Sequence, residues 1–155
     1  MKKLILTVAL LTSFQTLADT SVTFGGWSKH FGNEGSEYKL NENHNGYGLV
    51  TYPYTNGNHS LGGELWFMKD SHGNDAKHYG VNYRYKINDT FSLSTSLTYM
   101  DRTFRDDYII YRKETVTLFP YLTANIYKNL NVDITFVPKM GRETDVLFFR
   151  FNYKF

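Results

Sequence analysis

The chain ends in the stretch LFFRFNYKF, positions 147–155, which alternates with a period of two. Large apolar side chains occupy the odd positions, and the even positions are mostly polar. A strand that faces lipid on one side and the interior of a barrel on the other has this pattern. The stretch therefore predicts a β-strand that crosses a membrane.

Both ends of the chain indicate the same compartment. The aromatic last residue, Phe155, resembles the C-terminal signal of bacterial outer-membrane barrels. The first 18 residues combine Lys2 and Lys3, a short apolar core and the small residue Ala18, which is typical of a secretory signal peptide. The apolar core is too short for a transmembrane helix, which needs about 20 residues. We therefore expect a signal peptide at 1–18 and an outer-membrane barrel domain at 19–155.

The composition fits a small barrel and excludes several functions. Aromatic residues make up 17% of the chain, which suits the aromatic girdles at the two membrane interfaces. There is no cysteine, so a disulfide framework and thiolate chemistry are excluded. Removing Lys2 and Lys3 leaves a formally neutral chain with no basic field for nucleic acid. We expect a monomer that contacts membrane lipids.

Strand-like segments recur along the rest of the chain, each about as long as a tilted barrel strand. They are 21–31, 44–54, 58–69, 76–87, 91–101, 116–127, 130–138 and 145–155. Tight Asn- and Gly-containing turns alternate with longer charged connections, as they do in outer-membrane barrels. The prediction is an all-β fold, an eight-stranded antiparallel transmembrane barrel. The alternative is a soluble lipocalin-like barrel.

The alternation also separates the lipid-facing side chains from those in the lumen. The inner half of the lumen is expected to be polar, with Glu64, Asp133 and Arg150 among its charges. The outer half is expected to be apolar and able to hold an acyl chain; its side chains are Trp66, Met68, Met100, Phe119, Val137 and Phe148. The alternative is that these side chains simply fill the barrel.

Chemically capable side chains meet at one rim of the predicted barrel. His30 ends the first strand, and Asp70 and Ser71 follow the third. An imidazole, a carboxylate and a hydroxyl are the groups that acyl transfer requires. His30 would be the general base, Asp70 would orient His30 or Ser71, and Ser71 would be the nucleophile or an oxyanion donor.

Six short motifs resemble the lipid A palmitoyltransferase family. They are Trp27-Ser28-Lys29-His30, Leu40-Asn41-Glu42, Gly46-Tyr47-Gly48-Leu49, Phe67-Met68-Lys69-Asp70-Ser71 and the prolines of Leu118-Phe119-Pro120 and Phe136-Val137-Pro138. The resemblance implies that palmitate moves from a glycerophospholipid donor to lipid A, with His30, Asp70 and Ser71 as the catalytic residues. Pro120 and Pro138 cannot donate ladder hydrogen bonds, so they would form a lateral gate for lipid.

The chain departs from that family, and other functions stay open. It has no room for the amphipathic helix that precedes the family's first strand. A non-enzymatic barrel that acts through its extracellular loops is therefore the main alternative, and whether the chain is an enzyme is left open. A lipid A deacylase would need a His-x-Ser pair, which is missing. No cofactor is expected, and no metal site either, because His30, His44, His72 and His78 lack ligand spacing.

Overall fold

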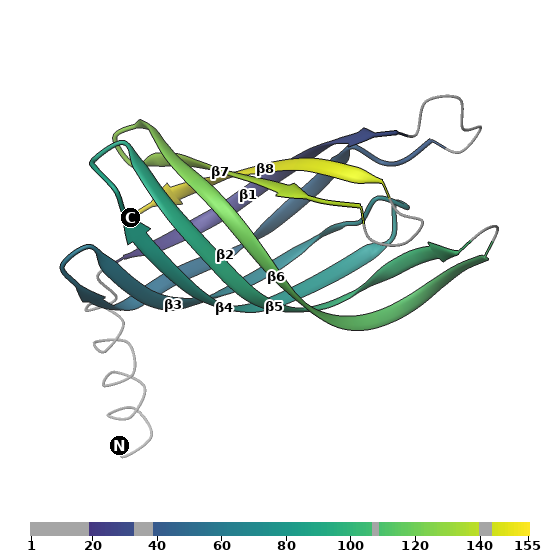
Figure 1. Cartoon of the computed structure of the whole chain (residues 1–155), viewed down its shortest axis with the longest axis horizontal. Coiled ribbons are helices and arrows are strands. Elements are labelled where there is room, and N and C mark those ends of the chain that lie inside the picture. Colours follow the sequence, from purple (N-terminus) through teal and green to yellow (C-terminus); the bar gives the residue numbers. More distant parts are fainter. Residues whose placement is uncertain (1–18, 33–38, 107–108, 140–143) are drawn as a thin grey trace, which may run out of the picture.

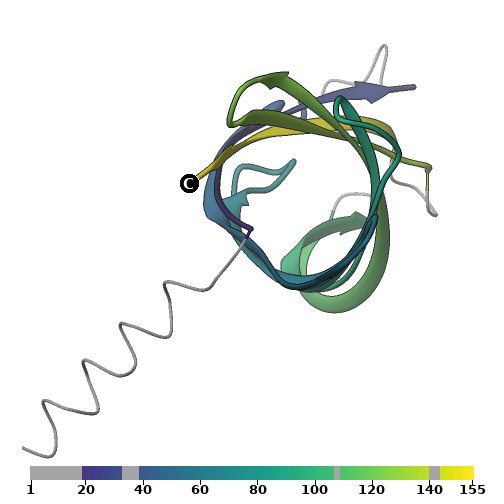
Figure 2. The same cartoon turned by 90° about the vertical axis from the view of Figure 1, so that its left-hand side faces the viewer.

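The computed structural model describes residues 19–32, 39–106, 109–139 and 144–155; the predicted signal peptide lies outside them. Antiparallel strands form one closed barrel in which each strand pairs with the next and the last pairs with the first (Figures 1 and 2). The predicted fold class is confirmed. The strands are β1 (Thr20–Phe31), β2 (Asn43–Asn56), β3 (His59–Lys69), β4 (Asp75–Lys86), β5 (Phe91–Asp106), β6 (Ile109–Tyr127), β7 (Leu130–Val137) and β8 (Asp145–Lys154).

The barrel closes where the ends of the described chain meet. The backbone N–H of Phe155 donates to the carbonyl oxygen of Thr20 at 3.2 Å, which places Phe155 in the seam between β1 and β8 as predicted. Trp27 stacks on Phe149 across this seam, with ring centroids 5.8 Å apart. Among the described residues, no helix is long and apolar enough to cross a membrane.

Tight turns gather at the end of the barrel that also carries the C-terminus (Figure 1). They join β2 to β3, β4 to β5 and β6 to β7. Gly57 and Lys128 have positive φ angles of 58° and 38° in two of these turns, a conformation that tight hairpins require. By the short-turn rule for outer-membrane barrels, this is the periplasmic end, and the opposite end is the outer one.

The segment 102–115, expected from its charges to be a loop, is instead a hairpin extension. The pairing of β5 with β6 continues through Arg102↔Lys113 to Asp106↔Ile109. Arg112 binds Asp101 across the pair at 2.6 Å. Antiparallel pairing needs only a neighbouring strand, so it continues beyond the lipid where the side chains become charged.

A belt of exposed apolar side chains surrounds the barrel wall. Its members include Val81, Leu97, Leu118, Leu122 and Phe136. A water-exposed surface of this extent is rare on soluble proteins, because apolar patches of that size are normally buried. The belt therefore marks the surface that contacts lipid, and a soluble lipocalin-like barrel is excluded.

A charged network fills the inner half of the lumen. Arg150 is almost fully buried and pairs with Glu64 at 2.6 Å and with Asp133 at 3.2 Å. Ser96 donates to Glu64, and Thr123 donates to Asp133. These bonds satisfy the buried charges and give the outer cavity a polar floor, as the alternation predicted.

Candidate active site

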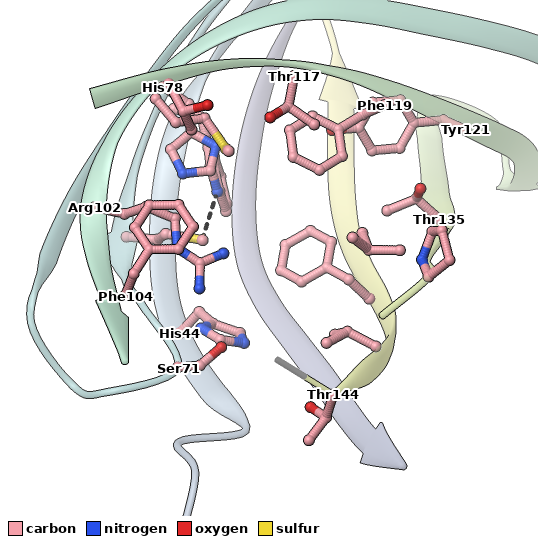
Figure 3. Close-up of a pocket in the computed structure, with 18 of the residues that line it drawn as sticks. His44, Ser71, His78, Arg102, Phe104, Thr117, Phe119, Tyr121, Thr135 and Thr144 are labelled. Atoms are coloured by element: carbon pink, nitrogen blue, oxygen red, sulfur yellow. Dashed lines mark hydrogen bonds between the residues drawn. The ribbon is translucent and has the colours of Figure 1, made fainter. Parts of the chain in front are cut away.

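A cavity of about 280 Å³ occupies the outer half of the lumen (Figure 3). The six residues predicted for an acyl-chain pocket all line it: Trp66, Met68, Met100, Phe119, Val137 and Phe148. Figure 3 shows His44 and Ser71 together toward one end of the cavity, with Phe119 and Tyr121 toward the other. The cavity therefore combines an apolar wall with polar, chemically capable groups at one end.

A bulge at Gly25 and Gly26 directs the end of β1 into the lumen. Against β8, the pairing advances three residues along β1, from Phe24 to Trp27, but only two along β8. Both glycines have positive φ angles, 84° and 96°, which β-carbon-bearing residues rarely adopt. The extra residue inverts the alternation, so Trp27 faces outward while Ser28 and His30 face inward.

His30 and Ser71 form one pair at the rim. The His30 Nε2 and Ser71 Oγ atoms lie 3.0 Å apart, and both side chains are buried. Backbone bonds hold Ser71 in place, because its carbonyl accepts from the N–H of Asn41 at 2.7 Å. His30 Nδ1 has no hydrogen-bond partner among the described residues, and the nearest carboxylate oxygen, on Glu42, is 3.9 Å away. This geometry suits an imidazole that takes a proton from a hydroxyl.

Asp70 lies beside this pair, but its carboxylate faces the turn between β3 and β4. One oxygen accepts from the backbone N–H groups of His72 and Asn74, at 2.9 and 3.0 Å. The other accepts from the backbone N–H of Thr103 at 2.9 Å and from the Thr103 hydroxyl. No hydrogen bond joins the carboxylate to His30 or Ser71 among the described residues. Asp70 therefore acts on the pair by fixing the turn that carries Ser71.

The environment of Asp70 makes its contribution to stability depend on pH. Burial raises the pKa of the carboxyl, but the hydrogen bonds from Thr103, Asn74 and His72 outweigh it, so the pKa lies below its ordinary value. The ionised carboxylate therefore stabilises the folded barrel at pH values above the ordinary carboxyl pKa of about 3.9. The stabilisation is lost as the pH falls through the lower pKa that Asp70 has in the folded barrel.

We expect Asp70→Asn to lower the unfolding free energy at pH 7 by about 1–3 kcal/mol, because bonds to a charged group are weakened. The difference between variant and wild type should shrink on acidification below pH 4. Urea unfolding of the refolded barrel at pH 7 and pH 3 measures it. A difference that is the same at both pH values would contradict the prediction.

The two prolines lie where β6 and β7 are not paired. Their described pairing ends at Leu122↔Ile134, although β6 extends outward to Ile109 and β7 to Val137. Pro120 lies in this stretch of β6, and Pro138 follows β7. Residues from both strands line the cavity at this height, among them Phe119, Tyr121, Val137 and Pro138. The unpaired stretch therefore borders the cavity directly.

Several residues of the site were not assigned a role from the sequence. His44 is 2% exposed and lines the cavity, and its Nε2 lies 2.8 Å from Ser28 Oγ. Arg102 and Lys113 add positive charge to the lining. The Gly25-Gly26 pair was the sequence signal that could have placed Ser28 and His30 on one inward face. Among the described residues, no group of three or more His, Asp or Glu side chains could hold a metal ion.

Known proteins resemble this chain in fold. No protein-family model matches the chain, and no curated protein sequence matches it. The structure of the Yersinia pestis outer membrane protein Ail in a phospholipid bilayer nanodisc matches with a TM-score of 0.51 and 18% identity, covering 88% of this chain and 99% of Ail. The N-terminal β-barrel domain of Pseudomonas aeruginosa OprF matches with a TM-score of 0.50 and 9% identity, covering 88% and 97%.

The sequence identities are too low for these similarities to indicate a function. Neither of them supports the resemblance to the lipid A palmitoyltransferases specifically. Together with the lipid-facing belt, they show that the chain has the fold of the small eight-stranded barrels of bacterial outer membranes.

Proposed function

We propose that the barrel is an outer-membrane acyltransferase that moves a fatty acyl chain from a glycerophospholipid to lipid A or a related lipid. One observation carries the proposal. Ser71, hydrogen-bonded to His30, lines one end of a largely apolar cavity, inside a barrel whose outer wall contacts lipid. The pair supplies a base and a hydroxyl where an ester carbonyl would sit if the acyl chain filled the cavity.

The cavity has the character of an acyl-chain site. Trp66 is 1% exposed and forms its wall together with Met68, whose sulfur accepts from the Trp66 ring N–H at 3.1 Å. Below it, the guanidinium of Arg150 lies over the rings of Tyr121 and Trp66, at 4.9 and 5.4 Å. Burying an apolar chain against the wall is favourable, whereas pushing it against the charged floor would desolvate Arg150 and is unfavourable. The floor therefore ends the space available to the chain.

Lipid would enter through the unpaired stretch between β6 and β7. Pro120 lacks a backbone donor, and the open seam faces both the lipid and the cavity. An acyl chain could cross there without breaking ladder hydrogen bonds, whereas a paired seam would have to open.

A disulfide across this seam tests the route, since the chain has no native cysteine. Extending the register places residue 120 opposite residue 136, so Pro120→Cys with Phe136→Cys should cross-link. We expect oxidation to remove most of the acyltransferase activity and a reductant to restore it. Leu122→Cys with Ile134→Cys, at the last paired position, is the matched control and should keep its activity when oxidised. A barrel that stays active while cross-linked at 120 and 136 would refute this entry route.

Mass spectrometry of lipid A tests the function itself. Cells that express the barrel should contain a lipid A species heavier by one acyl chain, and cells without it should not. Purified barrel with a labelled glycerophospholipid and lipid A should transfer the label. Unmodified lipid A in both assays would refute the proposal.

The second candidate is a barrel without chemistry that acts through its extracellular loops. The fold comparisons fit it better than the acyltransferase, because neither the outer membrane protein Ail nor the OprF barrel domain is described as an enzyme. The outer ends of the strands carry charged side chains that such a barrel could present, including Lys69, Asp75 and Arg112. If lipid A is unchanged while cells that express the barrel gain a binding property, this second function is supported.

A further inference from the structure

A second serine–histidine pair lies beside the first. Ser28 Oγ and His44 Nε2 are 2.8 Å apart, and the other ring nitrogen of His44, Nδ1, lies 2.6 Å from the carbonyl oxygen of Lys69. Ser28 is 6% exposed and His44 is 2% exposed. The three groups come from β1, β2 and β3, so the pairing of three neighbouring strands holds them together.

The carbonyl of Lys69 decides which ring nitrogen of His44 carries the proton. A carbonyl oxygen can only accept, so Nδ1 carries the hydrogen and donates it. In the neutral ring, Nε2 is then an acceptor, and the Ser28 hydroxyl must donate to it. A serine hydroxyl that donates to an imidazole, whose far side is held by an acceptor, has the arrangement of an activated nucleophile.

The pair borders the same cavity through His44. His44 lines the cavity, and its ring packs against Phe148, another lining residue, with centroids 5.5 Å apart. Ser28 is opposite Phe148 in the β1–β8 register. Ser28 and His30 are two residues apart on the inward face of β1, so the two pairs are separated by about 7 Å.

The first pair is held differently. His30 has no hydrogen-bond acceptor at Nδ1 among the described residues, so nothing fixes its ring as Lys69 fixes His44. The orientation that nucleophilic catalysis requires is therefore present at Ser28–His44 and weaker at His30–Ser71.

We infer that Ser28 is the nucleophile that opens the ester of the acyl donor, with His44 as its base; for the nature of the donor, this rests on the proposed function. Ser28 Oγ attacks the acyl carbonyl carbon and passes its proton to His44 Nε2. The bond from that carbon to the donor oxygen breaks, and His44 returns the proton to the departing alcohol. The acyl group is left as an ester on Ser28. A hydroxyl of the acceptor, with His30 taking its proton, then attacks this ester. The bond from the acyl carbon to Ser28 Oγ breaks, and the proton passes from His30 through water to Ser28 Oγ.

An alkyl fluorophosphonate tests the inference on the folded full-length barrel in detergent. The probe bonds covalently to an activated serine, and its alkyl chain suits the cavity. Peptide mass spectrometry locates the modified residue in the wild-type protein without relying on any variant. We expect modification of Ser28, its loss in His44→Ala and His44→Gln, and its retention in Ser71→Ala. Ser21, buried on the same strand and hydrogen-bonded to no histidine among the described residues, is the internal control and should stay unmodified.

The labelling result is separate from the lipid A result. Modification of Ser28 without lipid A acylation would support the nucleophile and refute the proposed acceptor. Modification of Ser71 in place of Ser28 would overturn the inference and leave the proposed function standing. Acylation of lipid A by a Ser28→Ala barrel at the wild-type rate would also overturn it.

Discussion

Replacing His30 or Ser71 by alanine is expected to lower lipid A acylation about 10²–10⁴-fold, the loss that follows removal of a positioned base or its hydroxyl partner. The two side chains form one buried hydrogen bond of 3.0 Å at the cavity rim. His30→Ala removes the proton acceptor, and Ser71→Ala removes the group that orients it. Because the two act as a unit, the double variant should be little worse than either single variant.

Rates of transfer from a labelled phospholipid to lipid A, measured on refolded barrel in detergent, give the fold-change directly. His59→Ala is a matched control, since His59 sits at the periplasmic end and bonds the Tyr83 hydroxyl at 2.6 Å. It should keep the wild-type rate. The heat-dependent mobility shift of folded barrels in gels shows whether each variant still folds. A folded Ser71→Ala barrel that transfers acyl chains as fast as wild type would contradict the assignment.

Replacing Arg150 by alanine is expected to cost about 3–5 kcal/mol of unfolding free energy, because Glu64 and Asp133 would be left as buried charges without their cation. Arg150 is 2% exposed and bonds both carboxylates. Its guanidinium also lies over Tyr121 and Trp66, so the floor of the cavity would lose packing as well. The variant should refold with a lower yield and unfold at a lower urea concentration.

Urea titration of the refolded barrel, followed by tryptophan fluorescence, measures the loss. Arg112→Ala is the matched control, because it breaks an ion pair with Asp101 that is partly exposed, and ion pairs at the surface contribute about 1 kcal/mol or less. In Arg150→Met with Glu64→Gln, one cation and one anion are removed together, so part of the stability should return; Asp133 would still lack its cation. If Arg150→Ala is no less stable than Arg112→Ala, the network does not stabilise the barrel as its geometry suggests.

The sequence was sufficient where one local rule applied at every position. Alternation along β8 correctly placed Phe149 and Phe151 toward lipid and Arg150 toward the lumen, because successive side chains of a strand point to opposite faces. The same rule placed the six lining residues of the cavity on the inner face. The prediction was wrong at 102–115, which was expected to be a long charged connection although the pairing of β5 with β6 continues there.

Alternation alone determined the barrel, its lipid-facing belt and the polar inner half of its lumen, because those depend on the period of one strand at a time. The tertiary structure decided the site. The bulge at Gly25 and Gly26 turned Ser28 and His30 inward, and strand pairing brought them to His44 and Ser71. The tertiary structure also directed the Asp70 carboxylate toward the turn between β3 and β4, and it left β6 and β7 unpaired beside the cavity. These features depend on register between strands, which the period of a single strand does not contain.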